Sequence, residues 1–261
     1  MNNTIKKIGM IFISIAMLSS NLCAKDKLSA NELLNLAGKQ RMLSQRIAKD
    51  YLYIGKNIAK SKANRELKES MKSFLLAHKR LVSSIDNSEI KNLLEFVALS
   101  SGEFKDTSEK AFSLDNAQLI LDLSESMLEG SQYVFDSLKN SLKIKESDII
   151  ATAAKQRMLS QRIAKYYISY QSGIKDRNSV EMMRETVKQF GDNLNTLMKN
   201  STNTKEINHK LAEINRLWKI VHKFYINIEK GGLPLIVFNT TDNITKKMDE
   251  ITKLYLANSK R

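Results

Sequence analysis

The sequence has little of the residues that usually interrupt helices, with one proline and nine glycines in 261 residues. Because proline and glycine mark most turns, their scarcity argues for long helices. Aromatic residues are also scarce, at 7% of the chain, which favours packed helices over a sandwich or barrel. The apolar fraction of 42% argues against disorder. We therefore predict an all-α fold.

Cysteine is nearly absent, since Cys23 is the only one. It lies near the end of a segment with the features of a secretory signal peptide, in which two lysines precede a short apolar run over 8–18. Cleavage is expected after Ala24, so that residues 1–24 form the signal peptide and the mature protein is periplasmic. A retained N-terminal membrane anchor is the alternative. A lipoprotein fits less well, because the residues just before Cys23 are not small.

A mature chain without cysteine excludes disulfides, cysteine-based metal sites and covalently attached c-type haem. Its three histidines, His78, His209 and His222, do not have the spacing of metal ligands on one helix face. No glycine-rich phosphate loop, Ser/His/Asp arrangement or catalytic cysteine is readable. The sequence therefore predicts no enzymatic activity, no cofactor and no metal site.

The charge is strongly basic, at +14 for the whole chain, but the lysines are spread rather than clustered. Export argues against nucleic acid as a partner. Two interpretations stay open: a solvated basic surface, or attraction of anionic ligands, lipid headgroups or an acidic partner.

An internal duplication is the most informative feature. Residues 39–49 and 155–165 are both KQRMLSQRIAK, an offset of 116. At the same offset other apolar residues recur: Phe74 with Phe190, Leu81 with Leu197, Leu119 with Leu235, Ile120 with Ile236 and Leu138 with Leu254. We predict two tandem repeats, 25–144 and 145–261.

Each repeat is predicted to contain four helices. In the first repeat they cover 29–60, 63–85, 88–112 and 115 onward, and in the second 148–172, 177–199, 203–230 and 233–258. Ser29 followed by Glu32 forms a capping box at the first helix. No glycine or proline lies between Ser131 and Ser172. The repeats are therefore joined either by one long continuous helix or by a fresh helix start at Ser147 or Asp148.

Projected on a helix, the duplicated segment has two stripes. Leu36, Leu43, Ile47 and Ile54 form an apolar stripe facing a core. Ala37, Arg41, Ser44 and Ala48 form a second stripe of mainly small residues, repeated as Ala153, Arg157, Ser160 and Ala164. Small residues allow close helix packing, so Arg41 and Arg157 are expected to lie in helix–helix seams.

A buried arginine needs a partner, because an unpaired buried charge is costly. Neither eleven-residue segment contains an acidic residue. The partner is thus a carboxylate from another helix or a bound anion, which the guanidinium fork suits. Ser44 and Gln45, with Ser160 and Gln161, are candidate additional donors. Arg46 and Arg162 lie on the other flank of the stripe and are expected to fix neighbouring helices.

The run from Ala37 to Arg46 resembles the "P-box" of NarX-type and PilJ-type sensor domains, whose pattern is small-small-x-x-Arg-Met-x-Ser-x-Arg. Gly38 stands at the second small position of the first copy, and Ala154 at that of the second. The resemblance implies periplasmic four-helix sensor domains of nitrate/nitrite kinases and type IV pilus transducers. It also implies that Arg41 and Arg157 contact an anion between two symmetry-related first helices, either within one chain or across a homodimer.

The Met-Leu-Ser-Gln variant is closer to the pilus-transducer type, for which a nitrate ligand is not implied. No signalling module follows the second repeat in this sequence, so we expect a separate membrane-bound receptor or transducer. The predicted function is a sensory module for a small, anionic ligand, such as nitrate, nitrite or a carboxylate. The alternative is a structural or adaptor protein of the cell envelope without a ligand. Acidic partners for Arg41 and Arg157 favour the adaptor, and an electropositive pocket favours the sensor.

Overall fold

The computed structural model describes residues 28–142 and 148–258, and within them the chain is built from α-helices. The predicted signal peptide over 1–24, the predicted boundary between 144 and 145, and Ser147 lie outside the described residues. The elements are α2 (Ala30–Gly55), α3 (Lys60–Ser84), α4 (Ser88–Ser108), α5 (Leu114–Ser141), α6 (Asp148–Gln171), α7 (Arg177–Lys199), α8 (Lys205–Ile226), a 3-10 turn (Ile228–Lys230) and α9 (Pro234–Asn258). The all-α fold with two tandem four-helix repeats is confirmed.

Helix starts follow the capping signals. Ser29 caps α2 in a full capping box with Glu32. Asn87, Ser113, Asp176 and Thr204 accept backbone hydrogen bonds at the starts of α4, α5, α7 and α8. Each such bond satisfies an N–H that has no partner inside the helix. Polar capping residues therefore mark the starts of these five helices, whereas α3 begins after Ala59 without a side-chain cap.

The first helix ends earlier than predicted, at Gly55 rather than near residue 60. Asn57 and Ala59 adopt positive φ values of 57° and 47°, so the chain turns sharply before α3. Gly55 also allows the ring of Phe112 to pack directly on the helix end, where an added Cβ would lie 2.0 Å from that ring. The early ending places the α4–α5 connection against the end of α2.

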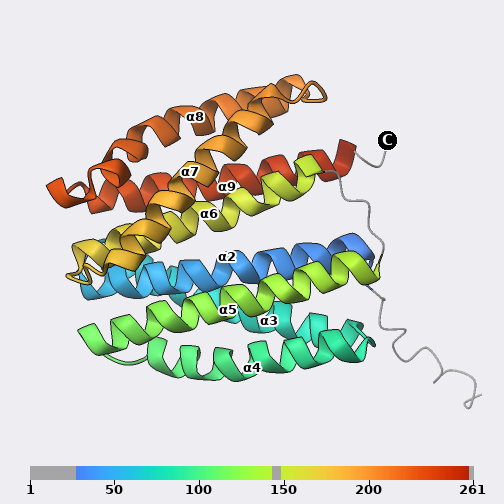
Figure 1. Cartoon of the computed structure of the whole chain (residues 1–261), viewed down its shortest axis with the longest axis horizontal. Coiled ribbons are helices and arrows are strands. Elements are labelled where there is room, and N and C mark those ends of the chain that lie inside the picture. The colour runs from blue at the N-terminus through green and yellow to red at the C-terminus, as the bar shows by residue number, and fades with distance from the viewer. Residues whose placement is uncertain (1–27, 143–147, 259–261) are drawn as a thin grey trace, which may run out of the picture.

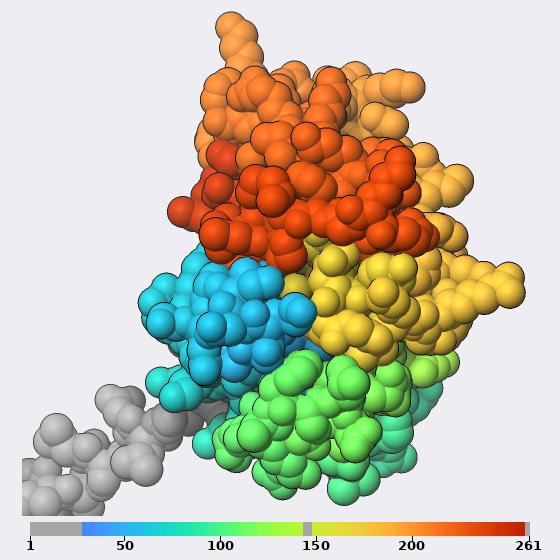
Figure 2. Space-filling model, turned by 90° about the vertical axis from the view of Figure 1, so that its left-hand side faces the viewer, coloured from blue at the N-terminus to red at the C-terminus, as the bar shows by residue number. Residues whose placement is uncertain are grey.

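The last helix of the first repeat, α5, and the first helix of the second repeat, α6, are two separate helices. Of the two alternatives, the continuous helix is not observed: α5 ends at Ser141, α6 begins at Asp148, and the two run in opposite directions (Figure 1). The result is that α2 and α6, the first helices of the two repeats, lie side by side in the same direction at the centre of the molecule (Figure 1). Viewed from one end, the other helices of the first repeat lie mainly below this central pair, and those of the second repeat lie mainly above it (Figure 2).

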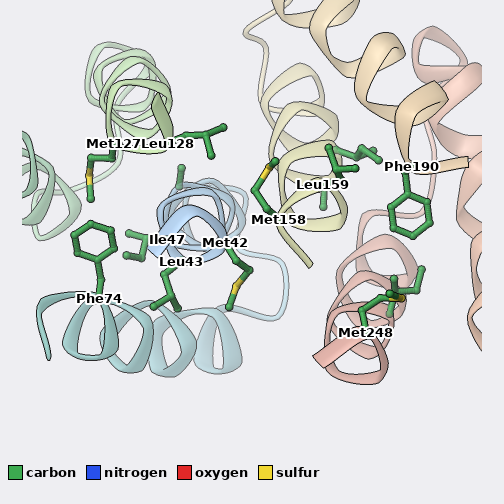
Figure 3. Packing of buried hydrophobic residues seen from close by; sticks show 14 of the residues in the cluster. Met42, Leu43, Ile47, Phe74, Met127, Leu128, Met158, Leu159, Phe190 and Met248 are labelled. Atoms are coloured by element: carbon green, nitrogen blue, oxygen red, sulfur yellow. The ribbon is translucent and has the colours of Figure 1, made fainter. Parts of the chain in front are cut away.

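A single hydrophobic core runs through both repeats. Leu43 and Ile47 of α2 point towards Phe74 of α3, while Leu159 of α6 lies towards Phe190 of α7 (Figure 3). Met158 extends from α6 towards α2, on the side where the repeats meet (Figure 3). The apolar stripe of the duplicated segment thus makes equivalent contacts in each repeat, and these contacts form parts of one core.

The predicted offset of 116 holds for the first two helices of each repeat but not for the last two. Buried residues of α4 and α5 have buried counterparts 117 positions later in α8 or α9. Examples of these pairs are Ile90 with Ile207, Leu94 with Leu211, Val97 with Ile214, Ile120 with Val237 and Leu138 with Tyr255. The predicted pairing of Leu119 with Leu235, Ile120 with Ile236 and Leu138 with Leu254 is therefore wrong by one residue. Leu235 and Ile236 are exposed, whereas Ile120 is buried.

We predict that the shared core unfolds as one unit. Phe74→Ala and Phe190→Ala each remove a fully buried ring, which costs about 3–5 kcal/mol. Both should lower the midpoint of the same single transition, measured by circular dichroism and by tryptophan fluorescence in denaturant. Phe96→Ala, at a half-exposed ring, is the control and should change little. Two separate transitions in either variant would contradict a common core.

Candidate functional site

The two copies of the duplicated segment lie on α2 and α6, and their first arginines approach one another. An atom built as Cβ on Gly38 would lie 3.5 Å from Nη2 of Arg41 and 3.8 Å from Nη2 of Arg157. Both side chains are only 4% exposed. Since both distances start from one point, the two guanidinium groups face the same small volume at the α2–α6 seam. Glycine at this position leaves that volume open.

Two contacts of Arg41 are with neutral groups of its own repeat. Its Nη1 donates to Oε1 of Gln132 on α5 at 2.6 Å, and its guanidinium lies 4.0 Å above the centre of the Phe135 ring. The ring face attracts the cation and covers it from solvent.

Arg157 has a carboxylate where Arg41 has an amide. Its Nη1 donates to Asp249 of α9 at 2.5 Å, and Nη2 reaches Asn35 of α2 at 3.4 Å. Gln132 and Asp249 are equivalent residues, 117 apart on α5 and α9. Burial alone would raise the pKa of Asp249, but the hydrogen bond from Lys253 and the charge of Arg157 lower it overall. The two copies of the motif are identical, but their surroundings are not.

The serines and glutamines of the motif do not reach the arginine pair. Ser44 and Ser160 each donate to the carbonyl oxygen of the arginine three residues earlier, both at 3.0 Å. Gln45 donates to the Ser124 carbonyl at 2.9 Å, and Gln161 donates to Thr245 at 2.7 Å. Gln45 therefore ties α2 to α5, whereas the hydroxyl of Ser44 bonds within its own helix. Gln161 and Ser160 both tie α6 to Thr245 of α9.

The second arginine of each motif binds neighbouring helices, as the sequence indicates for Arg46 and Arg162. Arg46 lies 3.1 Å from Glu66 of α3 and 3.9 Å from Asp242 of α9. Arg162 donates to Glu125 of α5 at 2.5 Å. Asp242 and Glu125 each belong to the other repeat.

Lys49 and Lys165, the last residues of the duplicated segments, complete these cross-repeat contacts. Both are fully buried. Lys49 lies 2.7 Å from Asp242, and Lys165 binds Glu125 and donates to Ser124 at 3.0 Å. Glu125 and Asp242 are equivalent residues at the 117 offset. Sequence reasoning did not single out these lysines, although their place in the identical segments was the available signal.

A family model described as "Type IV pili methyl-accepting chemotaxis transducer N-term" (PilJ) matches residues 24–95 and 144–235 of the chain. The two matched segments together span more than half of the sequence and contain the two motif helices. The chain belongs to the PilJ family. No curated protein and no solved structure matches it.

The two PilJ repeats meet at a groove of about 780 Å³ beside Arg157. The groove is lined by residues of α2, α3, α6 and α9, six of them basic and three acidic: Lys39, Arg46, Lys62, Arg157, Lys246 and Lys253 against Glu66, Asp242 and Asp249. A second, much smaller cavity of about 20 Å³ touches Gly38, Ala154 and Arg157 at the seam itself. Arg157 thus lies next to a polar, mainly basic opening, which Arg46 also lines.

Across the described part of this PilJ chain, no group of three or more His, Cys, Asp or Glu side chains could hold a metal ion. Nor is any described helix long and apolar enough to cross a membrane.

Buried charge at the cross-repeat contacts shifts several pKa values. Burial lowers the pKa of Lys165 to about 8, although Glu125 opposes the shift. Burial would raise the pKa of Glu125, but Lys165 and Arg162 lower it to about 2. Asp50, buried beside Lys49, has its pKa raised to about 7 by burial, with Lys49 and Arg46 opposing. The Glu125 carboxylate therefore stabilises the fold of the PilJ repeats as an anion.

We predict that Glu125→Gln destabilises the protein by about 2 kcal/mol at pH 7, because it leaves buried Lys165 without its carboxylate partner. The cost is smaller than for a fully buried pair because Glu125 itself is partly exposed. The folded pKa of Glu125 lies below its ordinary value of 4.5. Its stabilisation is therefore present above that pH and is lost as pH falls towards 2. Urea unfolding at pH 7 and pH 3 measures the difference.

The exposed carboxylate Glu103 supplies the control, since Glu103→Gln should leave stability unchanged at both pH values. The difference in stability between the variant and wild type should be clearly smaller at pH 3 than at pH 7, because the stabilisation is lost progressively between pH 4.5 and pH 2. A deficit in Glu125→Gln that stays the same at both pH values would show that the loss is not due to the carboxylate charge.

Proposed function

We propose that this PilJ chain is an exported sensory module that binds a small oxyanion at the α2–α6 seam, between Arg41 and Arg157. The observation that carries the proposal is the convergence of both guanidinium groups on Gly38. Each guanidinium offers a planar fork of donors, which suits nitrate, nitrite or a small carboxylate.

Electrostatics support an anion at this place. Two cations that face one small volume repel each other, and burial weakens the screening by water. The charge of Lys155 adds to the effect: burial, Arg41 and Arg162 all lower the pKa of this lysine. Asp249 offsets part of this positive charge by pairing with Arg157, and a bound anion would add to that compensation beside Gly38.

The size of the seam cavity implies a coupled movement. A volume of about 20 Å³ is roughly what one water molecule needs, so a nitrate-sized ligand requires α2 and α6 to separate slightly or Arg157 to turn towards the larger groove. Ligand binding would then change the packing of the central helices. Such a change is what a sensory module must pass to a partner, which we propose is a separate membrane-bound transducer.

Both arginines come from one chain, so the two-fold pair needs no homodimer. Export rests on the signal-peptide features of residues 1–24 and on the extracytoplasmic place of PilJ sensor regions. Secretion to the periplasm by a cleaved signal is proposed on that basis, with an uncleaved N-terminal anchor as the alternative.

Thermal-shift and calorimetric screening against nitrate, nitrite, acetate and small dicarboxylates tests the anion site. A ligand at a hundred times its Kd adds about 2.7 kcal/mol, which corresponds to roughly 5–10 °C for a chain of this size. Arg41→Ala, Arg157→Ala and the charge-preserving Arg41→Lys should each remove most of that shift. Arg80→Ala, at an exposed arginine, should not. If wild type and the Arg41 and Arg157 variants respond identically to every compound, the anion site is refuted.

One observation favours the second candidate function, an envelope adaptor without a ligand: Asp249 already pairs with Arg157 at 2.5 Å. The equivalent Gln132 provides a matched exchange. If an anion binds, Asp249→Gln should increase its affinity about tenfold by removing a competing carboxylate, and Gln132→Asp should reduce it by a similar factor. Isothermal titration with the best ligand from the screen measures both. If no compound in the screen binds the wild type, the adaptor is favoured, and binding that neither exchange changes would place the anion away from the seam.

A further inference from the structure

A second groove, here called the lysine groove, has a volume of about 820 Å³ and lies within the first repeat. It is enclosed by the C-terminal end of α2, the first half of α3, the end of α4 and the connection to α5. The segments that form it lie next to each other at the end of the molecule shown in Figure 2, in blue and green. Tyr51 is ten residues beyond Arg41 on α2, or about 15 Å along a helix axis, so the groove is separate from the arginine seam.

The groove has an apolar floor and a basic rim. Tyr51, Leu67, Met71, Leu75 and Phe112 provide apolar surface. Five lysines surround it, against one acidic residue, Glu109: Lys60, Lys68, Lys72, Lys105 and Lys110. Lys105 pairs with Glu109 at 3.1 Å, while the other four form no ion pair with any described residue. The rim is therefore suited to an anionic group beside an apolar one.

The second repeat shows that the fold itself does not require this opening. Ser101 and Ser108 of α4 are buried, and the buried positions 117 residues later in α8 are Trp218 and Tyr225. Tyr225 packs against Tyr167, the counterpart of Tyr51, with ring centres 5.8 Å apart. A large ring thus fills in the second repeat a place where the first repeat has the small Ser108, which lines the lysine groove.

The rim differs between the repeats as well. At the positions equivalent to Lys60, Lys105 and Lys110 the second repeat has Asp176, His222 and Asn227. The equivalents of Lys68 and Lys72 remain basic, as Arg184 and Lys188, but each of them pairs with a carboxylate. The apolar opening and the high density of lysines occur together in the first repeat and are both reduced in the second.

We propose that the lysine groove binds an amphipathic monoanion of the fatty-acid class. The acyl chain would lie on Tyr51, Leu67, Met71 and Phe112, and the carboxylate would lie among the rim lysines. The volume is in the range of pockets for drug-sized ligands, which fits one acyl chain better than an extended polypeptide. The net positive rim favours an anion over a neutral lipid. This site goes beyond the proposed oxyanion function and does not depend on it.

Isothermal titration of the full exported protein with octanoate, decanoate, decanol and acetate tests the proposal. Decanoate should bind, acetate should not, and decanol should bind more weakly because it lacks the charge. Affinity should rise about fourfold for each added methylene, hence about tenfold or more from octanoate to decanoate. Absence of decanoate binding would overturn the proposal, and equal affinity for decanol would overturn its anionic part.

Two variants locate the site. Ser108→Tyr places in the first repeat the residue that the second repeat carries, and should abolish decanoate binding, with Ser83→Tyr on an exposed face as its control. Lys68→Glu combined with Lys72→Glu should weaken binding at least tenfold, whereas Lys79→Glu with Lys91→Glu, also exposed but outside the groove, should not. Decanoate binding that survives both groove variants would place the ligand elsewhere and refute the site.

The same variants separate this proposal from the oxyanion site. Ser108→Tyr should keep the thermal response to small anions, and Arg41→Ala should keep decanoate binding. If Arg41→Ala instead abolishes decanoate binding while circular dichroism shows an intact fold, the acyl ligand occupies the seam and the lysine groove is not its site.

Discussion

Two buried lysines, each paired with a carboxylate of the opposite repeat, connect the two halves of the structure. Lys49 of the first repeat reaches Asp242 of the second, and Lys165 of the second reaches Glu125 of the first. Lys49 also lies 3.2 Å from Asp50 of its own helix. Removing Glu125 leaves the charge of fully buried Lys165 without its carboxylate partner, which costs several times the net value of an exposed pair. Lys49 thus connects α2 to α9, and Lys165 connects α6 to α5, so each motif helix is bound to the opposite repeat. The same pair of motif helices brings Arg41 and Arg157 together at Gly38.

The all-α fold and the tandem organisation could be predicted from the sequence because they depend on local signals. Scarce breakers, capping residues such as Ser29 and a repeated apolar stripe specify helices wherever they lie in space. The offset was right for α2 and α3, where the identical segment anchors it. It was wrong by one residue for α4 and α5, because the connection between the second and third helices differs in length and no identical segment marks the change.

The partners of the polar side chains could not be predicted in the same way. The sequence placed Arg41 in a seam, but two helices packed against α2 in space, α5 and α6, determine what it meets. The motif serines were expected to face a ligand, yet a serine hydroxyl inside a helix readily bonds the carbonyl of the preceding turn. The importance of Lys49 and Lys165 was not apparent, since a lysine at the end of a polar run usually faces solvent. These choices are made by tertiary packing.

A symmetric pair of motif helices is ordinarily the property of a homodimer, in which every substitution appears on both sides. Here both helices belong to one polypeptide, so each side can change alone. Two pairs of equivalent positions have changed in this way: Gln132 corresponds to Asp249, and Ser108 corresponds to Tyr225. Because the two repeats are covalently joined, they can differ in sequence. The second repeat can keep a filled core, while the first keeps an open groove. The ion pairs Lys49–Asp242 and Lys165–Glu125 keep the two different repeats packed together.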